Sequence, residues 1–373
     1  MNGNTSVTLL RGVMAILFAA ISLSLISSRS SAQTRGFVYV ATNQPSGNSV
    51  IQFARAANGT LAKLHETSTG GLGGTGNGVG ALDPLGSQDS LVLNGTGSLL
   101  LVVNAGSDQL SAMSASSTGL QLKSIVSSGG SFPNSVALSG DLVYVLNAHG
   151  TPNISGFRVS ADGILTAIPN STTALPGGSI AKPHDVRFSP DGTHLIVSDE
   201  GNNQLDVFEL GSDGLVTNVN TQPSAGSAPF GMRFARTGVL VNTEANSGSV
   251  SSYALSDDTL MVISPAVGDG QAATCWVTVT RDGKFAFISN TGSGNLSTYQ
   301  VGGNGRLNLA IDIAASIGKG APIDTSLTSD GAFLYVDDSA LGRVVIFRVH
   351  GASLHAVGSV NGLPTTLQGI AAQ

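Results

Sequence analysis

Short apolar runs that end on Asn or Asp recur along the chain and predict β-strands. Seven segments share this form: "FVYVATN", "LLLVVNA", "LVYVLNA", "HLIVSDE", "GVLVNTE", "FAFISNT" and "FLYVDDS". Each is short, rich in Val, Ile, Leu and aromatic residues, and bounded by turn-forming residues, which is typical of a buried strand rather than a helix. The chain therefore contains seven copies of one β unit.

Each unit has three further parts. A strand that ends in a tight turn precedes the run in "HDVRFSPDG", "FGMRFARTG", "CWVTVTRDG" and "IDTSLTSDG". Asp-Gly at that point is a hairpin signal. A third strand follows, as in "QLDVFEL" and "NLSTYQV", and a fourth begins near Gly-x-Leu, as in "NGTLAKL" and "NGRLNLA". The unit is thus predicted to be a four-stranded antiparallel meander.

The spacing of the units predicts a closed ring. Corresponding positions such as Asn104, Asn147 and Asp199 recur every roughly 43 to 52 residues, and Asp337 marks the last copy. Four strands at that period are typical of a β-propeller, whose blades bury their faces only against neighbouring blades. We predict an all-β, seven-bladed β-propeller that forms a single domain over residues 33–373.

The two ends of the chain are predicted to complete one blade. The first unit begins directly at its second strand, residues 37–43, with no first strand before it. The segment "TLQGIAAQ", residues 366–373, follows the fourth strand of the last unit. A C-terminal strand placed there would close the ring and remove the exposed sheet edges.

Composition narrows the function classes. The chain is 41% hydrophobic and 11% charged, with 49 glycines and a net charge of -6. Its few basic residues are scattered, which argues against a nucleic-acid partner. Cys275 is the only cysteine, so no intramolecular disulfide can form. We predict no cofactor and no metal site, because no His/Cys/Asp cluster has zinc spacing. Whether a divalent ion binds at the channel mouth is left open.

A Gly-rich segment, "TGGLGGTGNGVGALDPLGS" at residues 69–87, interrupts the even spacing. Glycine at this density predicts a flexible surface loop. A phosphate cradle would need a following Lys-Ser/Thr and a strand-to-helix context, and neither is present.

The N-terminus has the form of a secretory signal peptide. Arg11 precedes the apolar run "VMAILFAAISLSLI", and the small residues Ser30, Ser31 and Ala32 follow. The run is shorter than the roughly 20 residues that a membrane-spanning helix needs. We expect residues 1–32 to be removed and the mature protein to be exported to the periplasm or outside the cell, with no integral membrane segment. We also expect a monomer.

Hairpin geometry places candidate functional residues on one rim. A strand that leaves a rim, turns at Asp-Gly and returns must end on the rim where its partner started. The starts of the first strands therefore share a rim, and they carry Asp89, Asn134, His184, Phe230, Cys275 and Ile323. The residues that follow the second strands share it too: Asp108, His149, Asp199, Glu200, Glu244, Thr291, Asp337 and Asp338. Function tends to concentrate where such loops converge on a channel.

The stretch "KPHDVRFSPDGTHLIVSDEG", with its six sister repeats, resembles the lactonase family of seven-bladed propellers. That family includes the propeller type of 6-phosphogluconolactonase and the fungal carboxymuconate lactonising enzyme. The Pro-His of the family is matched by Pro183 and His184, and its Asp-x-Gly by Asp199 and Gly201. The family glutamate is matched by Glu244, with the direction of the side chain left open by a one-residue difference in strand length.

The chain departs from the family at two arginine positions. Phe230 and Thr291 stand where the family has arginine. A guanidinium grips a carboxylate or phosphate through paired hydrogen bonds and can stabilise an oxyanion. Their absence leaves an anionic lactone with little to hold it.

The resemblance implies a hydrolase that opens a lactone at the channel mouth. His184 would be the general base for the attacking water, Glu244 would orient the histidine or its water, and Lys182 would support the developing oxyanion. Substrate-binding candidates are Lys182, Asp199, His149 and Phe230. The structural alternatives are a solvated lysine, a strand-ending Asp that bonds the backbone, and a turn histidine.

Two alternatives remain open at this stage. The first is a non-catalytic exported propeller that binds a protein or a surface polymer on the same rim, in place of a small-molecule lactone. Such a binder should expose a broad apolar patch, whereas the enzyme needs a His/Glu pair converging in a pocket. The second is a thiol nucleophile at Cys275, against which a buried, inert cysteine is the preferred interpretation.

Overall fold

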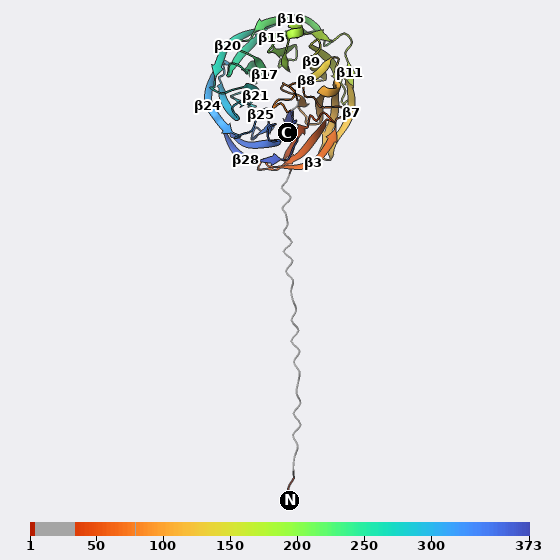
Figure 1. Ribbon diagram of the computed structural model, residues 1–373, viewed down its shortest axis with the longest axis vertical. Helices are drawn as coiled ribbons and strands as arrows, with labels where there is room; N and C mark the ends of the chain where they lie inside the picture. Colours follow the sequence, from red (N-terminus) through yellow and green to blue (C-terminus); the bar gives the residue numbers. More distant parts are fainter. Residues whose placement is uncertain (4–33, 79) are drawn as a thin grey trace. The chain divides into compact units, whose positions relative to one another are not determined.

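The computed structural model describes residues 1–3, 34–78 and 80–373. The predicted signal peptide, residues 1–32, falls almost wholly outside them. Among the described residues, no helix combines the length and the apolar character needed to cross a bilayer. Residues 34–373 form a ring of antiparallel sheets, seen down its axis in Figure 1.

The ring consists of seven sheets, as predicted, and each sheet is one blade. In order from the centre outward, blade 1 is β29 (Ile370–Ala372), β1 (Gly36–Ala41), β2 (Ser49–Arg55) and β3 (Leu61–Ser68). Blade 2 is β4 (Leu91–Leu93), β5 (Leu99–Asn104), β6 (Gln109–Ser116) and β7 (Gly119–Ser127). Blade 3 is β8 (Ser131–Ser139), β9 (Leu142–His149), β10 (Asn153–Val159) and β11 (Leu165–Ala167), with β12 (Thr173–Ala174) also paired to β10.

The other four blades have four strands each. Blade 4 is β13 (Pro183–Phe188), β14 (His194–Asp199), β15 (Gln204–Leu210) and β16 (Val216–Pro223). Blade 5 is β17 (Pro229–Phe234), β18 (Val239–Glu244), β19 (Ser249–Ser256) and β20 (Thr259–Gly268). Blade 6 is β21 (Thr274–Val279), β22 (Phe285–Asn290), β23 (Asn295–Val301) and β24 (Leu307–Ser316). Blade 7 is β25 (Pro322–Leu327), β26 (Phe333–Asp338), β27 (Arg343–His350) and β28 (Ser353–Asn361).

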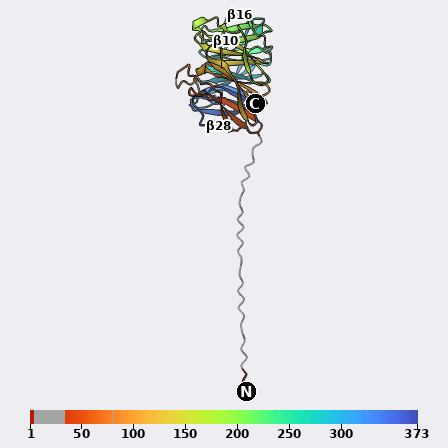
Figure 2. The same ribbon diagram turned by 90° about the vertical axis from the view of Figure 1, so that its right-hand side faces the viewer.

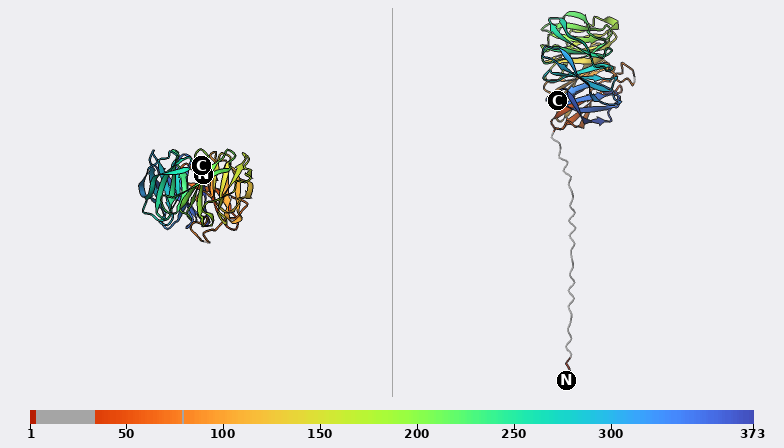
Figure 3. Two further views of the ribbon diagram at one scale, coloured as in Figure 1. Left: turned by 90° about the horizontal axis from the view of Figure 1, so that it is seen from above. Right: turned by 90° about the vertical axis from the view of Figure 1, so that its left-hand side faces the viewer.

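Two short 3-10 helices, η1 (Ala105–Ser107) and η2 (Gly178–Ile180), lie in connecting segments. The blades follow one another around the ring in sequence order, with β8, β17, β21 and β25 near the centre (Figure 1). Figures 2 and 3 show the same ring edge-on.

The hairpin turns have the conformation that their glycines predict. Gly192 of "SPDG" has φ 75° and Gly283 of "TRDG" has φ 74°. Side chains with a Cβ rarely adopt this left-handed region, so glycine is the residue that permits the reversal. The turn then sets the register in which the two inner strands pair.

The C-terminal strand closes the ring, as predicted from residues 366–373. β29 pairs antiparallel with β1, placing Val38 opposite Ala372 and Val40 opposite Ile370. The first and last blades also share one apolar cluster, in which Phe53 of β2 packs with Phe333 and Ile346 of blade 7. The sequence extremes of the domain therefore meet in a single packed blade.

A β-bulge repeats at the start of the inner strands. The register between first and second strands shifts at this point in blades 3 to 7, so that one or two residues there stand unpaired. These residues are Asn134 in β8, His184 in β13, Phe230 and Gly231 in β17, Cys275 in β21, and Ile323 and Asp324 in β25. A bulge re-aims a side chain and frees backbone groups from the ladder. The rim position singled out by the sequence is thus a bulge position.

The Gly-rich segment differs from its prediction as a surface loop. Its last four residues, 84–87, are buried: Leu85 is 4% exposed and Ser87 is fully buried. Residues 82–89, here called the channel segment, run past the starts of the inner strands and bond to those of blades 3 to 7 and to Gln368, just before β29. The reason is that the bulged inner strands leave backbone groups facing the channel, and buried groups of that kind need partners.

Gln88 shows how the channel segment links the blades. Its backbone N–H donates to the carbonyl of His184 at 3.0 Å. Its side-chain Nε2 donates to the carbonyl of Met232 at 2.8 Å, and its Oε1 accepts from the N–H of Val277 at 2.8 Å. One glutamine therefore joins blades 4, 5 and 6.

Neighbouring residues of the segment reach the other inner strands. Ser87 Oγ donates to the carbonyl of Asn134 at 2.7 Å, and the indole Nε1 of Trp276 donates to the Ser87 carbonyl at 2.9 Å. Gln368, just before β29, accepts from the N–H of Leu85 at 2.8 Å and donates to the Ser87 carbonyl at 2.8 Å. The channel segment is therefore a structural element of the ring.

Replacing Gln368 with Ala should destabilise the fold. The change would leave the Leu85 N–H and the Ser87 carbonyl without these partners in a buried place, at a cost of about 2–4 kcal/mol in the free energy of unfolding. Urea denaturation followed by the fluorescence of Trp276 measures this. The matched control is Gln300→Ala on the exposed face of β23, which should change the free energy by less than about 0.5 kcal/mol. Equal stability of the two variants would contradict the role assigned to the segment.

Candidate functional site

The rim that carries His184 contains a compact polar and aromatic cluster. The imidazole of His184, 9% exposed, stacks on the ring of Phe230 with centroids 4.2 Å apart. Phe230 in turn meets the edge of Trp276 at 4.9 Å. The three aromatic rings come from the inner strands of blades 4, 5 and 6, and the bulges in those strands set the direction of the side chains.

Both ring nitrogens of His184 face oxygen acceptors. Nδ1 lies 2.5 Å from the carbonyl oxygen of Gly86 in the channel segment, and Nε2 lies 2.8 Å from Oε2 of Glu200. Donating to both at once requires a proton on each nitrogen, which is the imidazolium form. The contact with Glu200 is then a charge-assisted hydrogen bond.

Glu200 sits directly after β14 and is the carboxylate of this site. Its backbone N–H donates to the carbonyl of Lys182 at 3.0 Å, which holds it beside the start of β13. The hydrogen bond from His184 is the main reason that the pKa of the Glu200 carboxyl lies below its ordinary value, and the Lys182 ammonium adds a smaller effect. The Glu200 side chain is 32% exposed, so it is the part of the pair that solvent can reach.

Asp83 of the channel segment adds a second carboxyl close to the histidine. Burial raises its pKa to about 6, against the lowering effects of the hydrogen bond from Gln368 and of the nearby His184. Its Oδ1 accepts from the N–H of Gly86 at 2.8 Å and from Gln368 Nε2 at 2.7 Å. Asp83 thus supports the turn whose carbonyl binds His184.

Glu244 has a different set of partners from the predicted one. Its Oε1 accepts from Ser224 Oγ at 3.0 Å and from the N–H of Gly226 at 2.8 Å, and its Oε2 accepts from Ser249 Oγ at 2.9 Å. It is fully buried in blade 5. The carboxylate that contacts His184 is Glu200, because the second strand that pairs with β13 ends beside it.

The register explains this difference. Pro183 pairs with Asp199 in blade 4, and Pro229 pairs with Glu244 in blade 5. Glu244 is therefore the blade 5 counterpart of Asp199, and both are fully buried strand-ending acids. In blade 7 Pro322 pairs with Asp338, so Asp338, and not Asp337, marks the repeat there.

Asp199 and Lys182 lie next to the pair but play different parts. Asp199 Oδ1 accepts from the N–H groups of Lys182 at 2.8 Å and Gly201 at 3.0 Å, which orders the loop behind Glu200. The Lys182 side chain is exposed. It is the cation of the candidate site.

His149 belongs to another part of the rim. Its exposed ring stacks on Phe132 with centroids 4.1 Å apart. The two rings line a cavity of about 440 Å³ together with residues 72–76 of the Gly-rich segment. Among the described residues, no hydrogen bond joins this histidine to His184.

Cys275 has the surroundings of an inert thiol. It is 7% exposed and packs with Phe230, Trp276 and Ile323 in one apolar cluster. Burial raises the pKa of the thiol well above its ordinary value, so the thiolate is disfavoured. The residues described here contain no cluster of His, Cys, Asp and Glu suited to a metal ion.

The family model described as "Lactonase, 7-bladed beta-propeller" matches residues 90–262 and 237–365. The chain belongs to this family. The match covers blades 2 to 7 and so includes His184 and Glu200, while the channel segment lies just before it.

Solved structures share the fold across most of the chain. The periplasmic gluconolactonase PpgL of Pseudomonas aeruginosa is 20% identical with a TM-score of 0.70, covering 89% of this chain and 98% of that one. A protein of Lactobacillus plantarum is 19% identical with a TM-score of 0.74, covering 91% and 99%. A Bacteroides fragilis protein, named provisionally as a 6-phosphogluconolactonase, is 19% identical with a TM-score of 0.70, covering 91% and 99%.

Among curated relatives, an uncharacterised protein of Staphylococcus saprophyticus is 26% identical over 142 residues. An uncharacterised protein of Staphylococcus epidermidis is 25% identical over 141 residues. These alignments take in 36% of this chain and span only 41% of the length of each relative.

The contact between His184 and Glu200 predicts that the pKa of the Glu200 carboxyl depends on the histidine. Replacing His184 with Asn should raise the pKa of the Glu200 carboxyl toward its ordinary value near 4.5, because the main lowering contact is removed. A carboxyl whose pKa is lowered by folding contributes stability above the unfolded value, and that contribution is lost as pH falls through the folded value. The variant should therefore lose less stability between neutral and acid pH through this group.

The side-chain carboxyl ¹³C shift of Glu200, followed by NMR from pH 7 to pH 2, measures this pKa. Glu200→Gln assigns the signal. His194→Asn, at the far end of β14, is the matched control and should leave the titration unchanged. The same Glu200 pKa in the wild type and in His184→Asn would contradict the contact.

Proposed function

We propose that this protein hydrolyses lactones and that the His184–Glu200 pair is its acid–base centre. The observation that carries the proposal is an imidazole nitrogen, at the start of β13 in a lactonase-family propeller, 2.8 Å from a partly exposed carboxylate. An imidazole and a carboxylate in contact can accept and return a proton near neutral pH. The contacts of Glu244 with Ser224 and Gly226 support a role for that residue in blade structure instead.

The Gly86 carbonyl would determine which ring nitrogen of the neutral His184 carries the proton. It accepts from Nδ1–H, so the neutral imidazole keeps its lone pair on Nε2, facing Glu200. With the shared proton gone, Nε2 and Oε2 are both acceptors and would move apart from their 2.8 Å contact, which would let a water molecule donate to both. We assign the attacking water to this place.

The reaction then proceeds in two balanced steps. The oxygen of the water attacks the lactone carbonyl carbon while one of its protons passes to the His184–Glu200 pair. The tetrahedral intermediate collapses as the ring C–O bond breaks, and the pair returns the proton to the leaving oxygen, giving a hydroxy acid. Lys182 would act as a point charge near the developing oxyanion.

The substrate class follows from what surrounds the pair. Phe230, Cys275, Trp276 and Ile323 form an apolar cluster beside His184. With Phe230 and Thr291 in place of arginine, we assign a neutral lactone rather than a phosphorylated or carboxylated one. The apolar run after Arg11 supports action outside the cytoplasm, in the periplasm or beyond.

A non-catalytic, partner-binding propeller is the second candidate. It is favoured by the fact that protein acceptors already occupy both nitrogens of His184, whose ring is 9% exposed. Against it, Phe230 is buried and stacked and so offers no exposed apolar patch. The two candidates differ in whether the protein turns over a lactone at all and, if it does, whether that turnover needs Glu200.

Proton release by the mature protein, measured in a pH-stat with glucono-1,5-lactone, γ-butyrolactone and 6-phosphogluconolactone, tests the proposal. We expect turnover of a neutral lactone that falls by about 100-fold or more in His184→Gln and in Glu200→Gln. Glu209→Gln, an exposed carboxylate on β15 of the same blade, should keep full activity. No turnover of any lactone by folded wild-type protein would leave the binding candidate in its place.

A further inference from the structure

A second cavity lies at the other end of the inner strands. It has a volume of about 510 Å³ and is lined by the second halves of β13, β17, β21 and β25, by β29 and by the hairpin at residues 94–97. His184 stands at the start of β13, whereas Arg187 of the same strand lines this cavity. The channel segment lies toward the His184 rim, and its last residue, Asp89, also lines the cavity. The volume is in the range of small-molecule sites.

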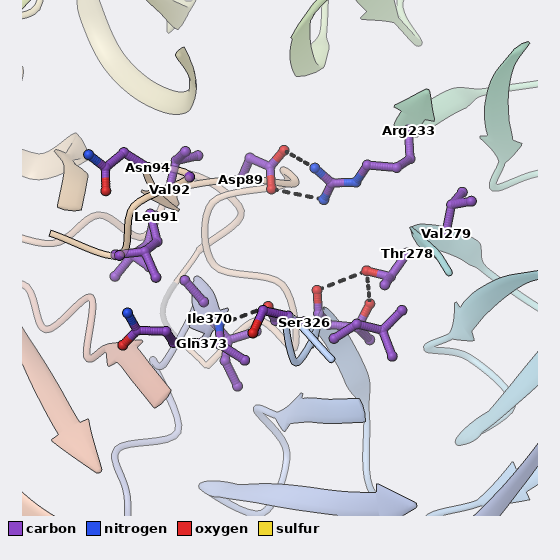
Figure 4. Close-up of a pocket in the computed structure, with 18 of the residues that line it drawn as sticks. Asp89, Leu91, Val92, Asn94, Arg233, Thr278, Val279, Ser326, Ile370 and Gln373 are labelled. Carbon is purple, nitrogen blue, oxygen red and sulfur yellow. Dashed lines mark hydrogen bonds and ion pairs between the residues drawn. The ribbon is translucent and has the colours of Figure 1, made fainter. Parts of the chain in front are cut away.

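Two guanidinium groups from adjacent blades face this cavity. Arg187 of β13 and Arg233 of β17 occupy equivalent positions of their strands and share the carboxylate of Asp89. Arg233 Nη2 lies 3.2 Å from Asp89 Oδ1, and Arg187 Nη2 contacts Asp89 Oδ2. Figure 4 shows Arg233 and Asp89 facing each other, with Thr278 and Ser326 on the far side of the cavity.

Of the carboxyl groups that the structure describes near the two arginines, only that of Asp89 lines the cavity. Arg187 also lies 3.5 Å from Asp185, but Asp185 is fully buried and accepts from the N–H of Met232 at 2.8 Å. Burial raises the pKa of Asp185 well above its ordinary value, which favours the neutral acid. The buried Asp324 is raised in the same way. Burial also lowers the pKa of Arg187 and of Arg233. Two guanidinium groups thus face one partly exposed carboxylate, that of Asp89.

The cluster also holds an unused donor. Nε of Arg187 is buried and has no hydrogen-bond partner in the described part of the chain. A guanidinium presents its donors as a planar fork that matches a carboxylate. A buried donor without a partner is costly, so a ligand oxygen that engaged this arginine would be favoured.

The walls provide the rest of a small-molecule site. Val92, Val279 and Leu327 are half-buried apolar side chains of the lining, and Thr278 and Ser326 add hydroxyl groups. Ser326 Oγ accepts from the N–H of Ala372 at 3.0 Å, which leaves its own O–H to donate. A ligand with a short hydrocarbon body and a carboxylate end would match both the walls and the arginines.

We propose that this cavity binds a small organic carboxylate, held by Arg233 and Arg187 with its carbon body against the apolar wall. The site is distinct from the His184–Glu200 pair. Carboxylate binding at this site does not depend on lactone hydrolysis, so it can be tested whether or not the protein hydrolyses lactones.

Isothermal titration calorimetry of the mature protein with succinate, lactate, sulfate and the neutral polyol erythritol tests the assignment. Saturable binding of succinate or lactate, weakened by added salt, is expected, with none for erythritol. Arg233→Gln should weaken the binding by about tenfold or more. Arg233→Lys keeps the charge but loses the fork, and should weaken it as well. Arg236→Gln, exposed and beyond the end of β17, is the matched control and should bind as the wild type.

Two results would overturn the proposal. One is the absence of saturable binding of either carboxylate, or binding that Arg233→Gln and Arg233→Lys leave unchanged while both variants melt like the wild type. The other is equal affinity for sulfate and succinate, which would reduce the site to a general oxyanion contact and remove the role of the apolar wall.

Discussion

The bulged starts of the inner strands leave polar backbone groups facing a closed channel, and the rest of the structure depends on how these groups are satisfied. In a propeller the inner strand is the edge of its sheet, so one side of it has no neighbouring strand. Here the channel segment supplies the partners, including Gln88 for His184, Met232 and Val277. A segment from outside the repeat thus joins strands that do not otherwise pair.

The same constraint builds the candidate site. The channel segment brings the Gly86 carbonyl to Nδ1 of His184, while the end of β14 brings Glu200 to Nε2. His184 is therefore held between the channel segment, which lies outside the repeat, and the end of β14, which belongs to the repeat. Its stacking on Phe230 adds an apolar wall on one face of the imidazole. At the opposite end of the inner strands, Arg187 and Arg233 meet Asp89, the last residue of the channel segment.

The sequence predicts the ring well because the fold repeats. Period, hairpin turns and the missing first strand of blade 1 together specify seven blades closed by residues 366–373, and the pairing of β29 with β1 confirms this closure. The prediction that His184 stands on a rim is likewise a matter of hairpin geometry. The repeat does not specify the partner of His184: Glu200 follows β14 whereas Glu244 ends β18, and only the strand register separates the carboxylate beside β13 from one buried in blade 5.

The burial of the channel segment could not be predicted in the same way. Residues 69–87 lie outside the repeat, and their glycine content is typical of a surface loop. The reason for their burial lies in the unpaired groups of strands far away in the sequence, for which no local pattern exists. The meeting of Arg187 and Arg233 could not be predicted for a related reason. A single arginine inside a strand does not show which neighbouring blade its side chain will face.

Native-state amide hydrogen exchange tests the central claim most directly, namely that the channel segment is part of the rigid centre of the ring. The N–H groups of Leu85 and Gln88 donate to Gln368 and to the His184 carbonyl. We predict that they exchange as slowly as the N–H of Val277 in β21 and open only with the whole domain. Exchange at the rate of the exposed hairpin at residues 95–97 would contradict the account.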